Sequence, residues 1–159
     1  MEPFLNKIKT LEEAKELCDA VKASGGRVVF TNGCFDILHP GHTRYLQDAR
    51  KLGDHLVVAV NSDRSVKAIK DPGRPILVEQ VRAELVASLA CVDSVLIFDE
   101  DTPLRVIKYL LPGILVKRVD WAEDEIVGTD EEKSAGGEVK RVTIEDGFTT
   151  TDIIEKIKN

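Results

Sequence analysis

Five short apolar segments alternate with helix-forming segments along the chain, and this order restricts the fold more than any other feature of the sequence. The apolar segments are rich in Val, Ile, Leu and Phe, as expected of buried strands. They span residues 27–30, 55–60, 94–98, 113–117 and 138–144. Helices between successive strands imply crossover connections, which place the strands parallel and the helices on both faces of the sheet. The pattern therefore predicts a doubly wound, Rossmann-like α/β fold with a five-stranded parallel sheet.

Capping signals mark the start of several helices. Thr10 and Glu13 form a capping box before the first helix. Thr102-Pro103 predicts another helix, with the threonine as N-cap and the proline as first helical residue. No internal repeat or linker interrupts the pattern. We therefore expect one domain over residues 1–159, with the N-terminal helix of residues 1–26 packed on it.

The composition is that of a globular protein with an acidic surface. Of 159 residues, 43% are hydrophobic and 31% are charged, and the net charge is −6. The acidic balance argues against general nucleic-acid binding, but not against small phosphorylated ligands in a local positive pocket. Because no long apolar run or signal-peptide core is present, we expect no membrane association and a cytoplasmic location. The three cysteines form no C-x-x-C pair, so they indicate neither structural zinc nor a disulfide framework.

Polar residues follow each predicted strand. They occupy Thr31–Asp36, Asn61–Asp63, Asp99–Thr102, Lys117–Trp121 and Glu145–Thr151. The carboxyl ends of parallel strands lie at one edge of the sheet, where ligands bind near a switch in strand order. We therefore expect a binding crevice along this edge.

The stretch TNGCFDILHPGH contains two histidines, His39 and His42, three positions apart. Zinc would need Cys34 as a third ligand at an unusual spacing, and no fourth ligand is near. Acid–base catalysis would need an orienting partner such as Asp36 and a nucleophile, and no serine or cysteine is clearly paired. Two histidines that flank a Pro-Gly helix start are also less typical of plain surface residues.

A phosphate clamp fits these histidines better. His39 precedes the predicted helix and His42 lies in its first turn, so both can face the helix N-terminus. The free N–H groups and the dipole there favour anions. Gly41 would let a phosphate approach the backbone, and the imidazoles would add donors. This arrangement suits phosphoryl or nucleotidyl transfer.

The chain resembles the H-x-G-H nucleotidyltransferase superfamily in two segments, FTNGCFDILHPGH and GDHLVVAVNSDRSVKAIKDPGRP. Together with CVDSVLIFDEDTP, LVKRVDW and GFTTTDIIEKI, it is similar to the adenylyltransferases that make ADP-heptose, over Arg27–Ile157. The resemblance implies transfer of AMP from ATP to D-glycero-β-D-manno-heptose 1-phosphate, with Mg²⁺, for the inner core of lipopolysaccharide. A glycerol-3-phosphate cytidylyltransferase and a non-catalytic nucleotide-binding relative remain alternatives.

The resemblance also implies partners. A homodimer is usual in the family. In many bacteria the domain is fused behind a sugar kinase. Because 159 residues are too few for such a kinase as well, we expect a separate heptose kinase to supply the sugar phosphate.

Site residues follow from the resemblance by position, and none of them is a metal ligand. The catalytic set is Thr31, His39 and His42. The nucleotide- and substrate-binding set is Asn32, Gly33, Cys34, Phe35, Asp36, Gly41, Asn61, Asp63, Arg82, Lys117, Asp120, Trp121, Gly147, Thr149, Thr150 and Thr151. Four of these residues have competing interpretations. Asp36 could cap a turn, Lys117 could be solvated, Trp121 could be a packing residue, and one of the threonines could be a plain N-cap.

The chain departs from the family in two places. Leu77, Val78 and Val81 replace an asparagine, a proline and an acid, which predicts a more hydrophobic surface suited to a subunit contact. Arg118 and Val119 replace two glycines at the predicted site. Because valine tolerates positive φ poorly, we expect an altered loop path and weaker substrate binding. Two orientations are open for Arg118, toward the nucleotide as a phosphate donor or into solvent, and we favour solvent.

Overall fold

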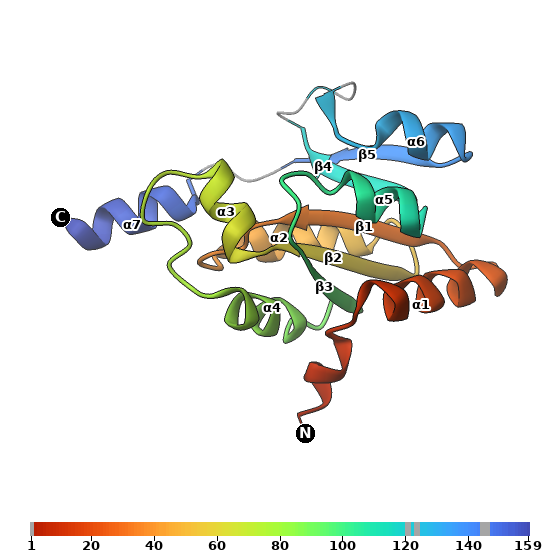
Figure 1. Ribbon diagram of the computed structural model, residues 1–159, viewed down its shortest axis with the longest axis horizontal. Coiled ribbons are helices and arrows are strands. Elements are labelled where there is room, and N and C mark those ends of the chain that lie inside the picture. The colour runs from red at the N-terminus through yellow and green to blue at the C-terminus, as the bar shows by residue number, and fades with distance from the viewer. Residues whose placement is uncertain (1, 120–121, 123–124, 144–146) are drawn as a thin grey trace.

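The computed structural model describes residues 2–119, 122, 125–143 and 147–159. It contains one five-stranded sheet in the order β3-β2-β1-β4-β5, and every pair of neighbouring strands is parallel (Figure 1). The strands are β1 (Val28–Gly33), β2 (His55–Asn61), β3 (Ser94–Phe98), β4 (Gly113–Arg118) and β5 (Glu138–Val142). The parallel doubly wound fold is therefore confirmed.

The helices pack on the two faces of this sheet. They are η1 (Pro3–Lys7), α1 (Leu11–Ala23), α2 (Pro40–Arg50), α3 (Asp63–Ile69), α4 (Glu79–Ala87), α5 (Leu104–Leu110), α6 (Thr129–Ser134) and α7 (Thr150–Lys158). One core cluster joins α2 and α4 to the sheet through residues such as Leu46 and Val86. The other joins α1 and α5 through Cys18 and Leu110. The sheet is thus buried from both sides, as its apolar strands predict.

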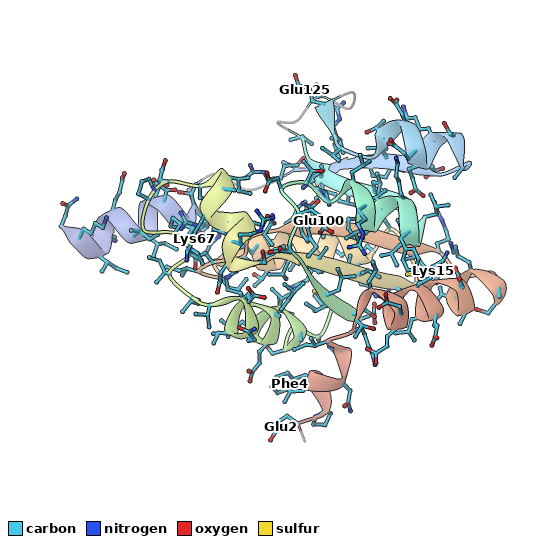
Figure 2. All side chains as sticks on the ribbon, in the orientation of Figure 1. Glu2, Phe4, Lys15, Lys67, Glu100 and Glu125 are labelled. Atoms are coloured by element: carbon cyan, nitrogen blue, oxygen red, sulfur yellow. The ribbon has the colours of Figure 1, made fainter. Side chains whose placement is uncertain are left out.

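The N-terminal segment packs on both faces. Helix α1 buries Ala14 and Cys18 in the second cluster. The preceding 3-10 helix η1 carries Phe4, which packs against the first cluster (Figure 2). Between them, the Lys9 amide donates a hydrogen bond to the Val95 carbonyl at 2.7 Å.

The helix starts follow the sequence signals with one exception. The Thr10–Glu13 capping box is present at α1, and Thr149 caps α7 by accepting a hydrogen bond from the Asp152 amide. The predicted Thr102 cap is wrong: α5 begins at Leu104, Pro103 occupies the N-cap position, and no side chain caps this helix. No helix within the described ranges is long and apolar enough to span a membrane.

The strand order changes direction next to β1. The chain runs outward from β1 through β2 to β3, then crosses to β4 on the other side of β1. The pairing of β1 with β4 ends at Phe30 and Leu115, although both strands continue to Gly33 and Arg118. Their carboxyl ends therefore separate at the topological switch point, where doubly wound sheets bind ligands.

Candidate active site

A cleft of about 610 Å³ opens at this switch point. Thirteen of the predicted site residues line it: Asn32, Gly33, Cys34, Phe35, Asp36, His39, Gly41, His42, Asn61, Lys117, Thr149, Thr150 and Thr151. Of the other predicted residues, Thr31, Asp63, Arg82 and Gly147 are not in its lining. Asp120 and Trp121 lie outside the described residues.

The two histidines meet at the N-terminus of α2. His39 is the N-cap residue in extended conformation, and His42 lies in the first turn. Their rings stack with centroids 3.9 Å apart and an interplanar angle of 26°. The Nδ1 atoms of both rings are buried and have no hydrogen-bond partner among the described residues. Two buried polar atoms without partners on a helix start indicate a place for a ligand.

Gly41 is required by this pair. A Cβ atom on Gly41 would lie 2.8 Å from the Cε1 atom and 2.9 Å from the Nδ1 atom of the His39 ring. The ring therefore occupies the space that a side chain would need. The sequence predicted a close approach of phosphate to backbone at this glycine, and the structure adds a second reason for it.

Both rings are neutral at neutral pH. Burial lowers the pKa of His42 from 6.5 to about 4, and the charges of His39, Arg118 and Lys70 add to the effect. Burial also lowers the pKa of His39. A neutral imidazole offers one N–H donor and one acceptor, so the pair can donate to phosphate oxygens without a fixed positive charge.

Cations surround the histidines. Lys70, Arg74, Lys117 and Arg118 all line the cleft, against the carboxylates of Asp36 and Asp101. The site is therefore positive on a protein whose net charge is −6. A local positive pocket of this kind attracts polyanionic ligands.

Lys117 is not the solvated strand-end lysine of the competing interpretation. Burial and, to a smaller extent, the neighbouring Arg118 charge lower the pKa of its amine from 10.5 to about 8. Its Nζ atom lies 3.4 Å from the carbonyl oxygen of Asn32, across the gap between β4 and β1.

Arg118 also differs from expectation. The sequence predicted that it points into solvent, but this exposed side chain lines the cleft. The next residue, Val119, donates its amide to the Val142 carbonyl at 3.1 Å and so extends the pairing with β5. Arg118 thus places a cation at the site, and Val119 continues the hydrogen bonding to β5 by one residue beyond β4.

Thr31 acts within the fold rather than in the cleft lining. It is 1% exposed, and its hydroxyl donates to the Val116 carbonyl at 3.1 Å. Tyr45 donates to the same carbonyl at 3.0 Å and lies 2.8 Å from the Thr31 hydroxyl. These side chains satisfy a β4 carbonyl beyond the end of its pairing with β1. The phosphate contact of Thr31 stays a prediction, and in this structure its hydroxyl is engaged by Val116 and Tyr45.

Asp36 holds the loop between α3 and α4. Its carboxylate accepts hydrogen bonds from Arg74 Nε at 2.7 Å and from the amides of Ile76 and Leu77 at 2.8 and 2.9 Å. Burial opposes ionisation, but these donors lower the pKa of Asp36 below its ordinary value. The turn-capping interpretation therefore describes Asp36, and its effect on the cleft is to position Arg74.

Arg82 connects the loops after β1 and β2 by hydrogen bonds. It is fully buried, and its guanidinium donates to the carbonyls of Cys34 and Asn61 at 2.7 Å each. It also pairs with Asp63 at 2.9 Å and reaches the Leu77 carbonyl at 2.9 Å. In this structure Arg82 and Asp63 join the loops after β1 and β2, and their predicted role in substrate binding stays a prediction.

The threonines at the start of α7 also line the cleft. Thr149 caps the helix, and the Thr150 hydroxyl donates to the Ile37 carbonyl at 3.3 Å. Gly147 precedes them with a φ of 97°, a left-handed conformation that suits glycine. Phe148 lies between, with its ring stacked 6.5 Å from that of His39.

Sequence reasoning missed several lining residues. These are Tyr45, Ile69, Lys70, Arg74, Asp101, Thr102, Pro103, Ile126, Val127 and Phe148. Asp101, Thr102 and Phe148 fall in the polar segments expected along the binding edge, and the basic loop KDPGRP carries a further signal because it holds two cations in a Gly/Pro-rich segment. The loop after β3 is placed by Arg64, which pairs with Asp99 at 3.1 Å and Asp101 at 3.5 Å. Beside it, the Ser65 hydroxyl donates to the carbonyl of Glu100, labelled in Figure 2, at 2.7 Å.

The site has the donors for phosphate binding but no activated nucleophile. Burial raises the pKa of the Cys34 thiol, so it remains protonated. No group of three or more His, Cys, Asp and Glu side chains that could hold a metal ion occurs in the part of the chain that the structure describes. The arrangement is suited to binding phosphates and to stabilising charge that develops during their transfer.

Residues 30–156 match the cytidylyltransferase-like family. The chain belongs to this family. The matched range includes the histidine pair, the Lys117–Arg118 pair and the threonines of α7. These features therefore lie within the matched cytidylyltransferase-like domain.

Curated relatives of this domain are longer. The bifunctional protein HldE of Geotalea uraniireducens is 53% identical over 152 residues, which are 96% of this chain and 31% of the relative. The protein of the same name from Haemophilus ducreyi is 51% identical over 151 residues, 95% of this chain and 32% of the relative. The chain thus spans about a third of these proteins.

A solved structure shares the fold. The crystal structure of a lipopolysaccharide core biosynthesis protein from Thermoplasma volcanium matches with a TM-score of 0.65 at 32% identity. The match covers 78% of this chain and 100% of that one.

Proposed function

We propose that this chain transfers AMP from ATP to D-glycero-β-D-manno-heptose 1-phosphate, giving ADP-heptose and pyrophosphate for lipopolysaccharide synthesis. The observation that carries the proposal is the stacked, neutral histidine pair on the N-terminus of α2, in a cationic cleft at the switch point. Identities near 50% to proteins named HldE, and a neighbour titled as a lipopolysaccharide core biosynthesis protein, support this substrate.

The reaction matches what the site offers. A phosphate oxygen of the sugar 1-phosphate attacks the α-phosphorus of ATP, a new O–P bond forms, and the bond to the β-phosphate bridging oxygen breaks. The second pKa of a phosphate monoester is about 6, so the nucleophile is ionised at neutral pH and needs no general base. The remaining tasks are alignment and stabilisation of the departing pyrophosphate. His39, His42 and the helix N-terminus supply donors for that purpose.

Magnesium fits as a partner of the nucleotide. Mg²⁺ usually keeps several waters and binds substrate phosphates with one or two carboxylates. In the cleft, Asp36 is saturated by Arg74 and two amides, and Asp101 lies at the rim near Arg64. We infer that the ion enters with ATP and that Asp101 is the lining carboxylate best placed to approach it. Bound there, Mg²⁺ neutralises phosphate charge.

A pyrophosphate-release assay tests the proposal. The purified chain is supplied with ATP or CTP and a panel of sugar and polyol phosphates, with and without EDTA. We expect turnover with ATP and the heptose 1-phosphate that stops in EDTA. Preferred turnover of CTP with glycerol 3-phosphate would instead assign a cytidylyltransferase, an alternative that the family match keeps open. Absence of turnover with every pair would leave a nucleotide-binding protein.

We further propose a cytoplasmic homodimer that uses the product of a heptose kinase. The use of ATP supports the location. Ile76, Val78 and Val81 are 52%, 53% and 41% exposed, and Leu85 is 38% exposed one turn further along α4. This apolar stripe includes two of the three departures from the family, and it is suited to a subunit contact. Light scattering of Val81→Glu against wild type tests it, and an unchanged dimer would exclude this face.

A further inference from the structure

The cleft contains two separate groups of anion-binding residues. One group is the histidine pair on α2 with Lys70 and Arg74 from the loop after α3. The other is at the carboxyl end of β4, where Lys117 and Arg118 are consecutive. Successive side chains of a strand point to opposite faces of the sheet, yet both of these line the cleft. The cleft therefore passes around the end of β4.

The Lys117 amine is placed for a ligand that the fold itself does not provide. Its hydrogen bond to a described residue is a long one, 3.4 Å to the Asn32 carbonyl. The carboxylates of the cleft lining are engaged elsewhere, Asp36 with Arg74 and Asp101 with Arg64. A partly buried ammonium next to an arginine is stabilised when an anion binds beside it.

The two groups are close enough for two phosphates to meet. Arg118, Lys70 and His42 line the same cleft, and the charges of both cations act on the His42 ring, so both groups lie near this histidine. The separation of β1 from β4 beyond Phe30 and Leu115 gives room beside the ring. Adenylyl transfer needs this geometry, because a triphosphate and a monophosphate must approach despite their repulsion.

We propose that Lys117 and Arg118 form the subsite for the phosphate of the acceptor sugar, while the histidine pair and the loop after α3 hold the triphosphate. The inference rests on the proposed function and assigns one substrate to each group. It also reverses the expectation from sequence that Arg118 weakens binding. The arginine and the lysine neutralise the incoming monophosphate and orient its oxygen toward the α-phosphorus.

Arg118→Gln tests this subsite, because the side chain is exposed and its loss should not disturb folding. We expect KM for the sugar 1-phosphate to rise by roughly 10- to 100-fold, the scale of a charge-assisted hydrogen bond. KM for ATP and the calorimetric Kd of Mg-ATP without acceptor should change by less than about 3-fold. Arg118→Lys should restore most of the acceptor affinity. Lys117→Met should act in the same direction as Arg118→Gln.

Arg27→Gln is the matched control, since Arg27 is an exposed arginine before the start of β1, away from the cleft. In the part of the chain that the structure describes, it forms an ion pair with the exposed Glu138. If the wild type turns over and Arg118→Gln raises KM for ATP, or changes neither KM, the assignment of the subsite is wrong and the proposed function stands. A wild-type chain that neither uses nor binds a sugar 1-phosphate by calorimetry would overturn both.

Discussion

Replacement of Asp36 by asparagine should release the loop that positions Arg74. The carboxylate is 1% exposed and accepts hydrogen bonds from Arg74, Ile76 and Leu77 at 2.7–2.9 Å. Breaking a buried ion pair by removing one partner costs about 3–5 kcal/mol. Asparagine keeps one oxygen for an amide donor, and Arg74 borders the cleft and can turn toward water. We therefore expect Asp36→Asn to lower the free energy of unfolding by about 2–3 kcal/mol.

Urea unfolding followed by circular dichroism measures this loss. With an m-value of about 2 kcal/mol/M for a domain of this size, the midpoint should fall by about 1–1.5 M. Arg74→Met removes the pair from the other side and leaves two amide donors on the carboxylate, so its loss should be smaller. The double variant should lose less than the sum of the two single losses, because the residues interact directly.

The pH dependence checks the cause. The pKa of Asp36 is lowered by its donors, against the effect of burial, so its contribution is present above the ordinary value of 3.8 and is lost as the pH falls below it. The difference between wild type and Asp36→Asn should therefore shrink in acid. A loss below about 0.5 kcal/mol at neutral pH, or additive single losses, would refute the reasoning that the carboxylate clamps this loop.

Three further variants test the site and its surroundings. Gly41→Ala places a Cβ 2.8 Å from the His39 ring, so kcat in the pyrophosphate assay should fall by roughly 10-fold or more. Stability should not fall, because alanine is favoured over glycine in helices by about 1 kcal/mol. An unchanged kcat would show that the position of the His39 ring is unimportant. Gly137→Ala places a Cβ against the buried Glu132 carboxylate and should lower the free energy of unfolding, measured in urea, by about 1–3 kcal/mol. An unchanged free energy would show that the Glu132 side chain has room to move. Burial lowers the pKa of His42 from 6.5 to about 4, so the unfolded chain binds the proton more readily and stability falls as the pH drops from 6.5 toward 4, by up to about 3 kcal/mol. His42→Gln should flatten this slope, and an equal slope in the variant would contradict the assignment.

The fold could be predicted because its signals are local. The alternation of apolar strands with helices can be read along the chain, and strands β1 to β4 are largely buried, whereas the edge strand β5 is mostly exposed. The place of His39 and His42 on a helix start follows from the Pro-Gly between them. Helix α5 shows the limit of local signals, since Thr102 resembles a cap and the helix nevertheless begins at Leu104.

The roles of individual site residues depend on distant partners and could not be predicted. Thr31 and Arg82 lie next to site segments in the sequence, but their partners are the Val116 carbonyl and the Cys34 and Asn61 carbonyls. A hydroxyl or guanidinium that satisfies a buried carbonyl cannot be distinguished in sequence from one that binds phosphate. The same limit applies to Arg118, whose place in the cleft depends on where β4 ends.

The most direct test of the histidine pair is the single-turnover rate of ADP-heptose formation, measured with enzyme in excess of Mg-ATP and saturating sugar 1-phosphate. His39→Ala and His42→Ala should each reduce the rate constant by roughly 10²–10³, the scale of one preorganised donor to developing charge, with much smaller changes in the Kd of Mg-ATP. His55→Ala is the control, because this third histidine lies at the other end of β2 and bonds to Ser94; it should keep the wild-type rate. A wild-type rate in either His39→Ala or His42→Ala would contradict the account.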